Sequence, residues 1–248
     1  MSAPAFTDRS LRFLRALARN NRPEWFHARR AEYDTHLHAP MVGIVEQLAH
    51  DFARLAPELA AGPKVSMFRP WRDTRFSADK KPLKTHIAAV FPHRELGRLR
   101  GAGVYFEVTA DYVWIGGGVY APETPALHAI RGHVAEHHRR LRRVLAAPAF
   151  RRTFGEMHGA TLSRVPRGFD PGHPAADLLR HKQFLASREE PPAFATAPTF
   201  YRDLLATFTA MLPLVRFLNE PLLAAAREAA RDPLVDDGKR GRFERVRR

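Results

Sequence analysis

The sequence has 248 residues, of which 45% are hydrophobic, and a formal net charge of +14. This composition supports a folded core and excludes a chain that is disordered over most of its length. It contains no cysteine, which excludes disulfides, thiolate zinc sites and thiol nucleophiles. Neither a signal-peptide-like apolar run nor 18 consecutive apolar residues occurs, so we expect a soluble cytoplasmic protein without a membrane span.

The positive charge is concentrated in three stretches. Residues 64–86 hold seven Lys or Arg against two acids, residues 131–154 hold seven Arg against one acid, and residues 239–248 hold six bases against one acid. Patches of one sign attract phosphates, nucleic acid or acidic protein surfaces. The alternative is that the arginines coat exposed helices, above all in the second stretch and the tail.

Three helices are predicted in the N-terminal part of the chain. The first runs from Thr7, a plausible N-cap, to Asn20. Pro23 opens the second at its first turn, and a third runs from Pro40 to Pro57 in helical register. We expect these helices to form one layer whose aromatic side chains belong to the core.

Four strands are predicted close together in sequence, at 64–71, 87–91, 104–109 and 112–115, because their apolar and polar residues alternate. Neighbouring strands of this kind favour an antiparallel meander. A fifth short strand is predicted at 183–187.

Pro-punctuated helices are predicted after the meander. The first two begin near Pro125 and at Pro148, the third runs from Ala175 to Lys182, and the last runs from about Thr199 to Leu218 with an expected kink at Pro213. The fold class is therefore α+β, a mainly antiparallel sheet of about five strands packed by helices from both ends of the chain. We expect one domain over residues 1–231 and a basic, disordered tail over 232–248.

The stretch from Met67 to His86 stands out because aromatic residues alternate with its charges. Phe68, Trp71 and Phe76 indicate that part of it packs, while the charged neighbours face something else. Arginine offers paired planar donors for phosphate or carboxylate, and lysine adds a mobile point charge. The stretch therefore predicts an anion-binding place.

Gly116, Gly117 and Gly118 follow the second hairpin strand. Glycines inside a strand cost backbone entropy, so the fold needs their lack of side chains. Either a ligand or another backbone approaches the sheet here, or the strand bends to leave room for a helix or a ring. The spacing fits neither dinucleotide nor P-loop motifs, and we expect no cofactor.

His133, Glu136 and His137 match the H-x-x-E-H zinc pattern. On a helix both histidines share a face, with the glutamate beside them. The run of arginines that follows would surround a dication, and an exposed basic helix face is the favoured interpretation. We expect no metal.

Several long motifs occur in one order: NNRPEWFHARRAEY at 20–33, FRPWRDTRFSADKKPLKTH at 68–86, GGGVYAPE from 116, and SRVPRGFDPGHPAADLLRHKQFLASRE at 163–189. With these motifs the chain resembles, over about residues 6–220, the bacterial and fungal family known as domain of unknown function 2461. The resemblance implies a cytoplasmic α+β domain and supplies no activity, cofactor or substrate.

The leading functional hypothesis is a pocket for a phosphorylated or carboxylated small ligand. Its predicted binding residues are Arg69, Arg72, Arg75, Lys80, Lys84, Gly116, Gly117, Gly118, Lys182 and Arg188. Asp73 would orient an arginine or act as a base, and Tyr120 would cap the pocket. Further candidates for proton transfer are His86, Glu107 and Glu123.

Two other functions stay open. One is a nucleic-acid-binding module that uses the basic stretches, with Trp71 or Phe76 stacking on bases. The other is a structural role, in which the arginines form internal ion pairs. Whether the protein is an enzyme and how it assembles are left open.

Overall fold

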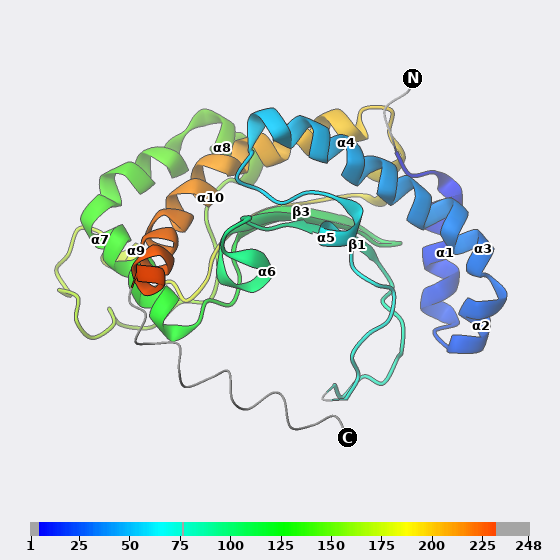
Figure 1. The fold of residues 1–248 in the computed structure, drawn as a ribbon, viewed down its shortest axis with the longest axis horizontal. Coiled ribbons are helices and arrows are strands. Elements are labelled where there is room, and N and C mark those ends of the chain that lie inside the picture. Colours follow the sequence, from blue (N-terminus) through cyan, green and yellow to red (C-terminus); the bar gives the residue numbers. More distant parts are fainter. Residues whose placement is uncertain (1–4, 76, 232–248) are drawn as a thin grey trace.

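The computed structural model describes residues 5–75 and 77–231. The predicted tail at 232–248 and Phe76 lie outside the described residues. The described chain is an α+β fold with one antiparallel sheet of four strands, packed by helices (Figure 1). None of the described helices combines the length and the apolar character that a membrane span requires.

The N-terminal layer contains the predicted helices. They are α1 (Asp8–Arg19), α2 (Pro23–Ala28), α3 (Arg30–Tyr33), a short π-helix η1 (Asp34–His38) and α4 (Ala39–Leu55). Thr7 caps α1 through a capping box with Ser10, whose hydroxyl accepts the Thr7 N–H at 3.0 Å. The apolar side of α4, which includes Ile44 and Leu48, is fully buried.

The sheet has the order β1 (Ile87–Phe91), β2 (Gly103–Val108), β3 (Val113–Val119) and β4 (Phe184–Glu190), and all its pairs are antiparallel. The predicted antiparallel arrangement is therefore confirmed for three strands of the meander and for the late strand. Alternate residues of β2 are buried and half-buried. One face of the sheet is thus packed on the core, and the other stays accessible.

The strand predicted at 64–71 is wrong. Gly62 has φ of 150° and Pro63 stands at a helix start, so residues Pro63–Ser66 form the one-turn helix α5. Met67 forms only an isolated antiparallel bridge to Ala89, a residue of β1. Arg98 accounts for part of this, because its guanidinium donates to the carbonyls of Val65 and Met67 that a ladder would use.

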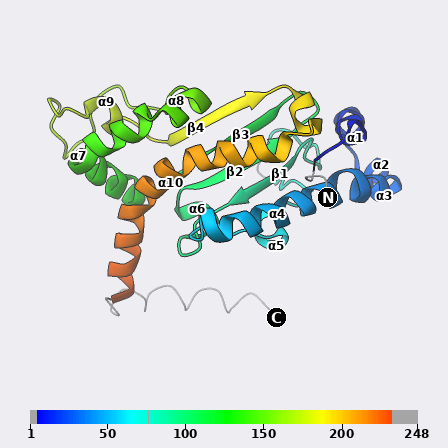
Figure 2. The ribbon, with the colours of Figure 1, turned by 90° about the horizontal axis from the view of Figure 1, so that it is seen from above.

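The remaining helices are α6 (Gly97–Arg100), α7 (Thr124–Ala146), α8 (Pro148–Phe154), α9 (Ala176–Leu179), the 3-10 turn η2 (Pro192–Thr196) and α10 (Phe200–Arg231). The helix predicted from Ala175 is shorter than expected, and the last helix is longer. Pro213 and Pro221 both lie inside α10, whose C-terminal part turns away from its first part (Figure 2).

The core lies between the sheet and the helices α4 and α10, which cover the same face of the sheet (Figures 1 and 2). Phe208 of α10 contacts the rings of Phe52 in α4, Phe91 in β1 and Phe106 in β2. No helix of this layer covers the opposite face, which we call the open face of the sheet.

Candidate functional site

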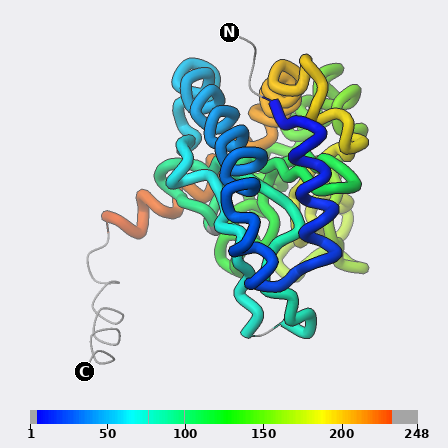
Figure 3. Tube along the Cα trace, turned by 90° about the vertical axis from the view of Figure 1, so that its right-hand side faces the viewer, coloured from blue at the N-terminus to red at the C-terminus, as the bar shows by residue number. Residues whose placement is uncertain are grey.

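Residues 70–75 and 77–84, which belong to the basic stretch 64–86, form an arm that leaves the sheet and returns to it (Figure 3, teal, at the bottom). Two backbone hydrogen bonds of 2.8 Å close its base, from Arg72 N to Pro82 O and from Lys84 N to Pro70 O. Trp71 packs the base of the arm against α2, because its ring centroid lies 5.7 Å from those of Phe26 and His27.

Acids of the arm itself offset two of the predicted ligand-binding arginines. Arg72 pairs with Asp79 at 2.6 Å, and Arg75 pairs with Asp73 at 2.7 Å. The hydrogen bond from Arg75 lowers the pKa of Asp73 to about 2. Asp73 is thereby held as an ionised partner of Arg75, a role that differs from that of a base poised near neutral pH.

A different set of cations meets at the open face, around the ring of Phe68. Lys84 Nζ and the Arg98 guanidinium each lie 4.6 Å from the centroid of that ring. Neither makes an ion pair within 4.0 Å among the described residues. Phe68 therefore holds two positive charges together, favoured by its π-system and offset by no carboxylate.

The protonated form of Lys84 is disfavoured in this setting. Partial burial lowers its pKa, and the positive charges of Arg69 and Arg98 lower it further. Arg69 is exposed, and within the described part of the chain its side chain makes no hydrogen bond or ion pair. The three cations repel one another, and an anion placed among them would relieve that repulsion.

Glu107 lies on β2 and is linked to Phe68 through Tyr105, whose ring contacts the Phe68 ring. The hydroxyl of Tyr105 donates to Glu107 Oε2 at 2.5 Å, and that of Tyr112 donates to Oε1 at 3.0 Å. Burial, helped by Glu107, raises the pKa of both tyrosines, so they stay protonated donors. The two hydroxyls fix the orientation of the carboxylate and leave it lone pairs for a further donor.

His86 connects the carboxylate with the cations. Its Nε2 lies 3.9 Å from Glu107 Oε2. Burial lowers the pKa of His86, Glu107 raises it, and Lys84 and Arg72 lower it again. The net shift is downward, so the imidazole is neutral near pH 7.

Aromatic contacts continue from Phe68 across the open face. The rings of Phe68 and Tyr105 lie 6.0 Å apart, and those of Tyr105 and Trp114 lie 5.7 Å apart. We call the whole group the open-face cluster. Its members are Phe68, Lys84, His86, Arg98, Tyr105, Glu107, Tyr112 and Trp114.

The glycine run packs against protein atoms. A Cβ on Gly116 would lie 2.7 Å from the Trp114 ring and 2.6 Å from the carbonyl of Ala186. A Cβ on Gly117 would meet Gly103 O at 2.4 Å. The glycines are therefore accounted for by neighbouring backbones, which belonged to the first alternative, and by an aromatic ring, which belonged to the second.

Three other predicted site residues lie away from the arm. Arg188 pairs with Glu190 and donates to Thr207 of α10, on the helix-covered face. Lys182 is exposed just before β4, and Tyr120, directly after β3, is 71% exposed.

Lys80 lies within the arm, where its side chain donates to Thr74 O at 3.0 Å.

The H-x-x-E-H residues lie on α7, where the rings of His133 and His137 are 4.5 Å apart. His133 Nε2 contacts Glu220 Oε2 at 3.2 Å, and Arg140 pairs with the same glutamate. Among the described residues, no group of three or more metal-ligating side chains is arranged to hold an ion. The arginine beside this cluster also opposes a dication.

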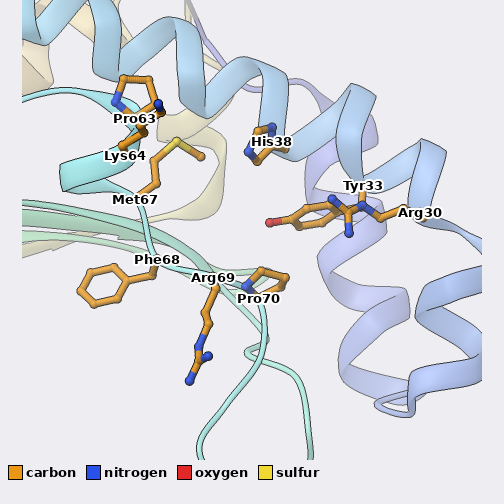
Figure 4. A pocket seen from close by; sticks show the side chains of 9 residues that line it. All are labelled: Arg30, Tyr33, His38, Pro63, Lys64, Met67, Phe68, Arg69 and Pro70. Atoms are coloured by element: carbon orange, nitrogen blue, oxygen red, sulfur yellow. The ribbon is translucent and has the colours of Figure 1, made fainter. Parts of the chain in front are cut away.

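A hollow of about 440 Å³ lies on the other side of residues 67–70 (Figure 4). Met67, His38 and the hydroxyl end of Tyr33 line it, and Arg69 extends away from them. Burial raises the pKa of Tyr33 to about 12. Arg30, at its rim, pairs with Asp34 at 2.9 Å. Lys64 and Arg69 also line the hollow and make no ion pair among the described residues, so positive charge without an acidic partner borders both the hollow and the open-face cluster.

Sequence reasoning missed Arg98, Tyr105, Tyr112 and Trp114. Tyr105 and Trp114 carried a usable signal, since each alternates with apolar residues along its strand and therefore lies on the face opposite to the core. Arg98 carried none, because only the fold brings α6 to Phe68. His86 and Glu107, considered for proton transfer, are brought together.

The chain matches, over residues 9–217, the model of a family described as conserved hypothetical protein, DUF2461. No curated protein and no solved structure matches it. The match spans most of the 248 residues and includes the arm and all four strands. The chain therefore belongs to the DUF2461 family of conserved hypothetical proteins.

Proposed function

We propose that the open-face cluster binds an anionic small molecule that carries a phosphate or carboxylate. The observation that carries this proposal is the placement of Lys84 and Arg98 over one phenyl ring without an acidic partner. Lys84 is partly buried, so its charge carries a desolvation cost that a bound anion offsets. Arg98 already donates to Val65 O and Met67 O and adds a second positive charge beside it.

The proposal keeps Lys84 from the sequence-based set and adds Arg98, while Arg69 lies outside the cluster and acts on it through its charge. Arg72 and Arg75 are already paired with acids of the arm, which favours a structural role for them.

The cytoplasm is the proposed location, and cell fractionation would test it.

Sulfate binding tests the proposal. We expect sulfate to raise the melting temperature of the protein and to give a measurable Kd by calorimetry. Lys84→Met should weaken sulfate binding about tenfold or more, since a charge-assisted contact of this kind contributes about 1.5–3 kcal/mol.

The matched control is Arg54→Met, which removes one positive charge from an exposed position of α4, outside the cluster. It should leave the Kd for sulfate unchanged at moderate salt. Equal weakening by both variants would show a net-charge effect, and failure of the wild-type protein to bind sulfate would show that the proposal is wrong.

A further inference from the structure

One end of the open-face cluster is cationic and the other is aromatic. This difference narrows the chemical class of its ligand. The cations gather at Phe68, next to the edge of β1. Trp114 lies two ring contacts away, on β3, and Glu107 lies between these ends beside Tyr105. A ligand that fills the cluster therefore needs an anion, a middle part with a hydrogen-bond donor, and a flat end.

Trp114 is suited to the flat end. Its ring is supported from two sides, since an added Cβ on Gly116 would lie 2.7 Å from the indole and the Tyr105 ring meets it at 63° with centroids 5.7 Å apart. Its side chain is half-buried, with the remaining surface on the open face. Stacking on such a supported indole is tolerant of base identity, because every base has a π-face.

Glu107 is suited to the middle part. The tyrosine hydroxyls hold both of its oxygens in place, and each oxygen keeps a lone pair that can accept a hydrogen bond. A pentose hydroxyl is a donor of the right kind, and carboxylates commonly accept from ribose hydroxyls.

Resting on the proposed anion binding, we infer that the open-face cluster takes a nucleoside monophosphate. The phosphate lies with Lys84 and Arg98, the pentose beside Glu107, and the base on Trp114. A polynucleotide fits less well, because Glu107 and the exposed Glu189, which is paired with Trp114 across β3 and β4, lie in the path of further phosphates.

Calorimetry with four probes tests the inference: AMP, ribose 5-phosphate, inorganic phosphate and a single-stranded octanucleotide. We expect AMP to bind about tenfold or more tightly than ribose 5-phosphate, because stacking separates the two. Trp114→Leu should abolish that difference by lowering the affinity for AMP to the level of ribose 5-phosphate. Trp114→Tyr, which keeps a ring, should retain most of it.

The outcomes separate the two proposals. If ribose 5-phosphate and AMP bind equally, the nucleotide inference is wrong while anion binding stands. If none of the phosphates binds, both are wrong. If the octanucleotide binds more tightly than AMP, with a steep loss of affinity as salt rises, a nucleic-acid surface replaces the mononucleotide site.

Discussion

Asn21 and Leu83 exchange two hydrogen bonds: the Asn21 side chain donates to Leu83 O at 2.9 Å and accepts from Leu83 N at 3.0 Å. Asn21 precedes α2, and Leu83, which is 1% exposed, precedes Lys84 in the arm. One amide side chain thus supplies both partners that a neighbouring strand would otherwise offer.

Asn21→Ala should lower the free energy of unfolding by about 1–3 kcal/mol, because it leaves a buried N–H and C=O of Leu83 unpaired. Urea denaturation measures this. It should also weaken sulfate binding, since the arm base holds Lys84. Asn20→Ala is the control: that side chain donates only to Ala16 O, and a cost of about 1 kcal/mol or less is expected. Equal costs would contradict the role given to Asn21.

A second asparagine side chain pairs with both backbone groups of one residue at the other end of the sheet. Asn219 of α10 accepts from Ala102 N at 2.7 Å and donates to Ala102 O at 3.0 Å, and both residues are buried. Asn219→Ala should cost at least about 2 kcal/mol, because it adds a cavity to the unpaired groups.

Chemical denaturation again gives the value for Asn219→Ala. Thr209→Ala, on an exposed side of the same helix, should change stability by about 0.5 kcal/mol or less. A small loss at Asn219 would mean that Ala102 finds other partners when the amide is absent.

Gly118 and Gly132 should respond in opposite ways to alanine. Gly118 has φ of 114°, and an added Cβ would lie 1.9 Å from Phe184 O. Gly118→Ala should therefore destabilise the protein by at least about 2 kcal/mol. Gly132 lies on an exposed position of α7 with open space around it. Gly132→Ala should raise stability by about 0.5–1 kcal/mol, as thermal or urea unfolding would show.

Much of the fold could be predicted because local signals agree with the packing. The alternation in β2 and β3 gives the strands, their two faces and the antiparallel hairpin, and Pro148 with Gly155 correctly brackets α8. The strand predicted at 64–71 failed because the alternation of its side chains competed with a helix start at Pro63. Gly62 and Pro63 start a helical turn, and that turn formed in place of the strand.

The candidate site could be predicted only in part, since it depends on pairings between distant residues. Charge counts placed an anion site in the arm, but they could not show that Arg72 meets Asp79 or that Arg188 faces α10. They also could not supply Arg98, which reaches Phe68 from α6. Composition locates a basic stretch, whereas the tertiary fold decides which of its charges lack a partner.

The pH dependence of sulfate binding should report on His86. In the free protein burial lowers the pKa of His86, and Lys84 and Arg72 add to this while Glu107 opposes it. A sulfate beside Lys84 adds negative charge and raises that pKa, so binding takes up a proton. The affinity should therefore increase as the pH falls through the bound-state pKa, and level off below the free-state pKa, which lies under 6.5.

Calorimetry between pH 8 and pH 5 measures this change, and sulfate itself does not titrate there. Tyr105 and Tyr112 stay protonated throughout, because their pKa values are raised. His86→Gln should bind sulfate as the wild-type protein does at pH 8 and should lose most of the increase at pH 5. A pH-independent Kd in the wild-type protein, or an increase that persists in His86→Gln, would contradict a sulfate site beside Lys84 and His86.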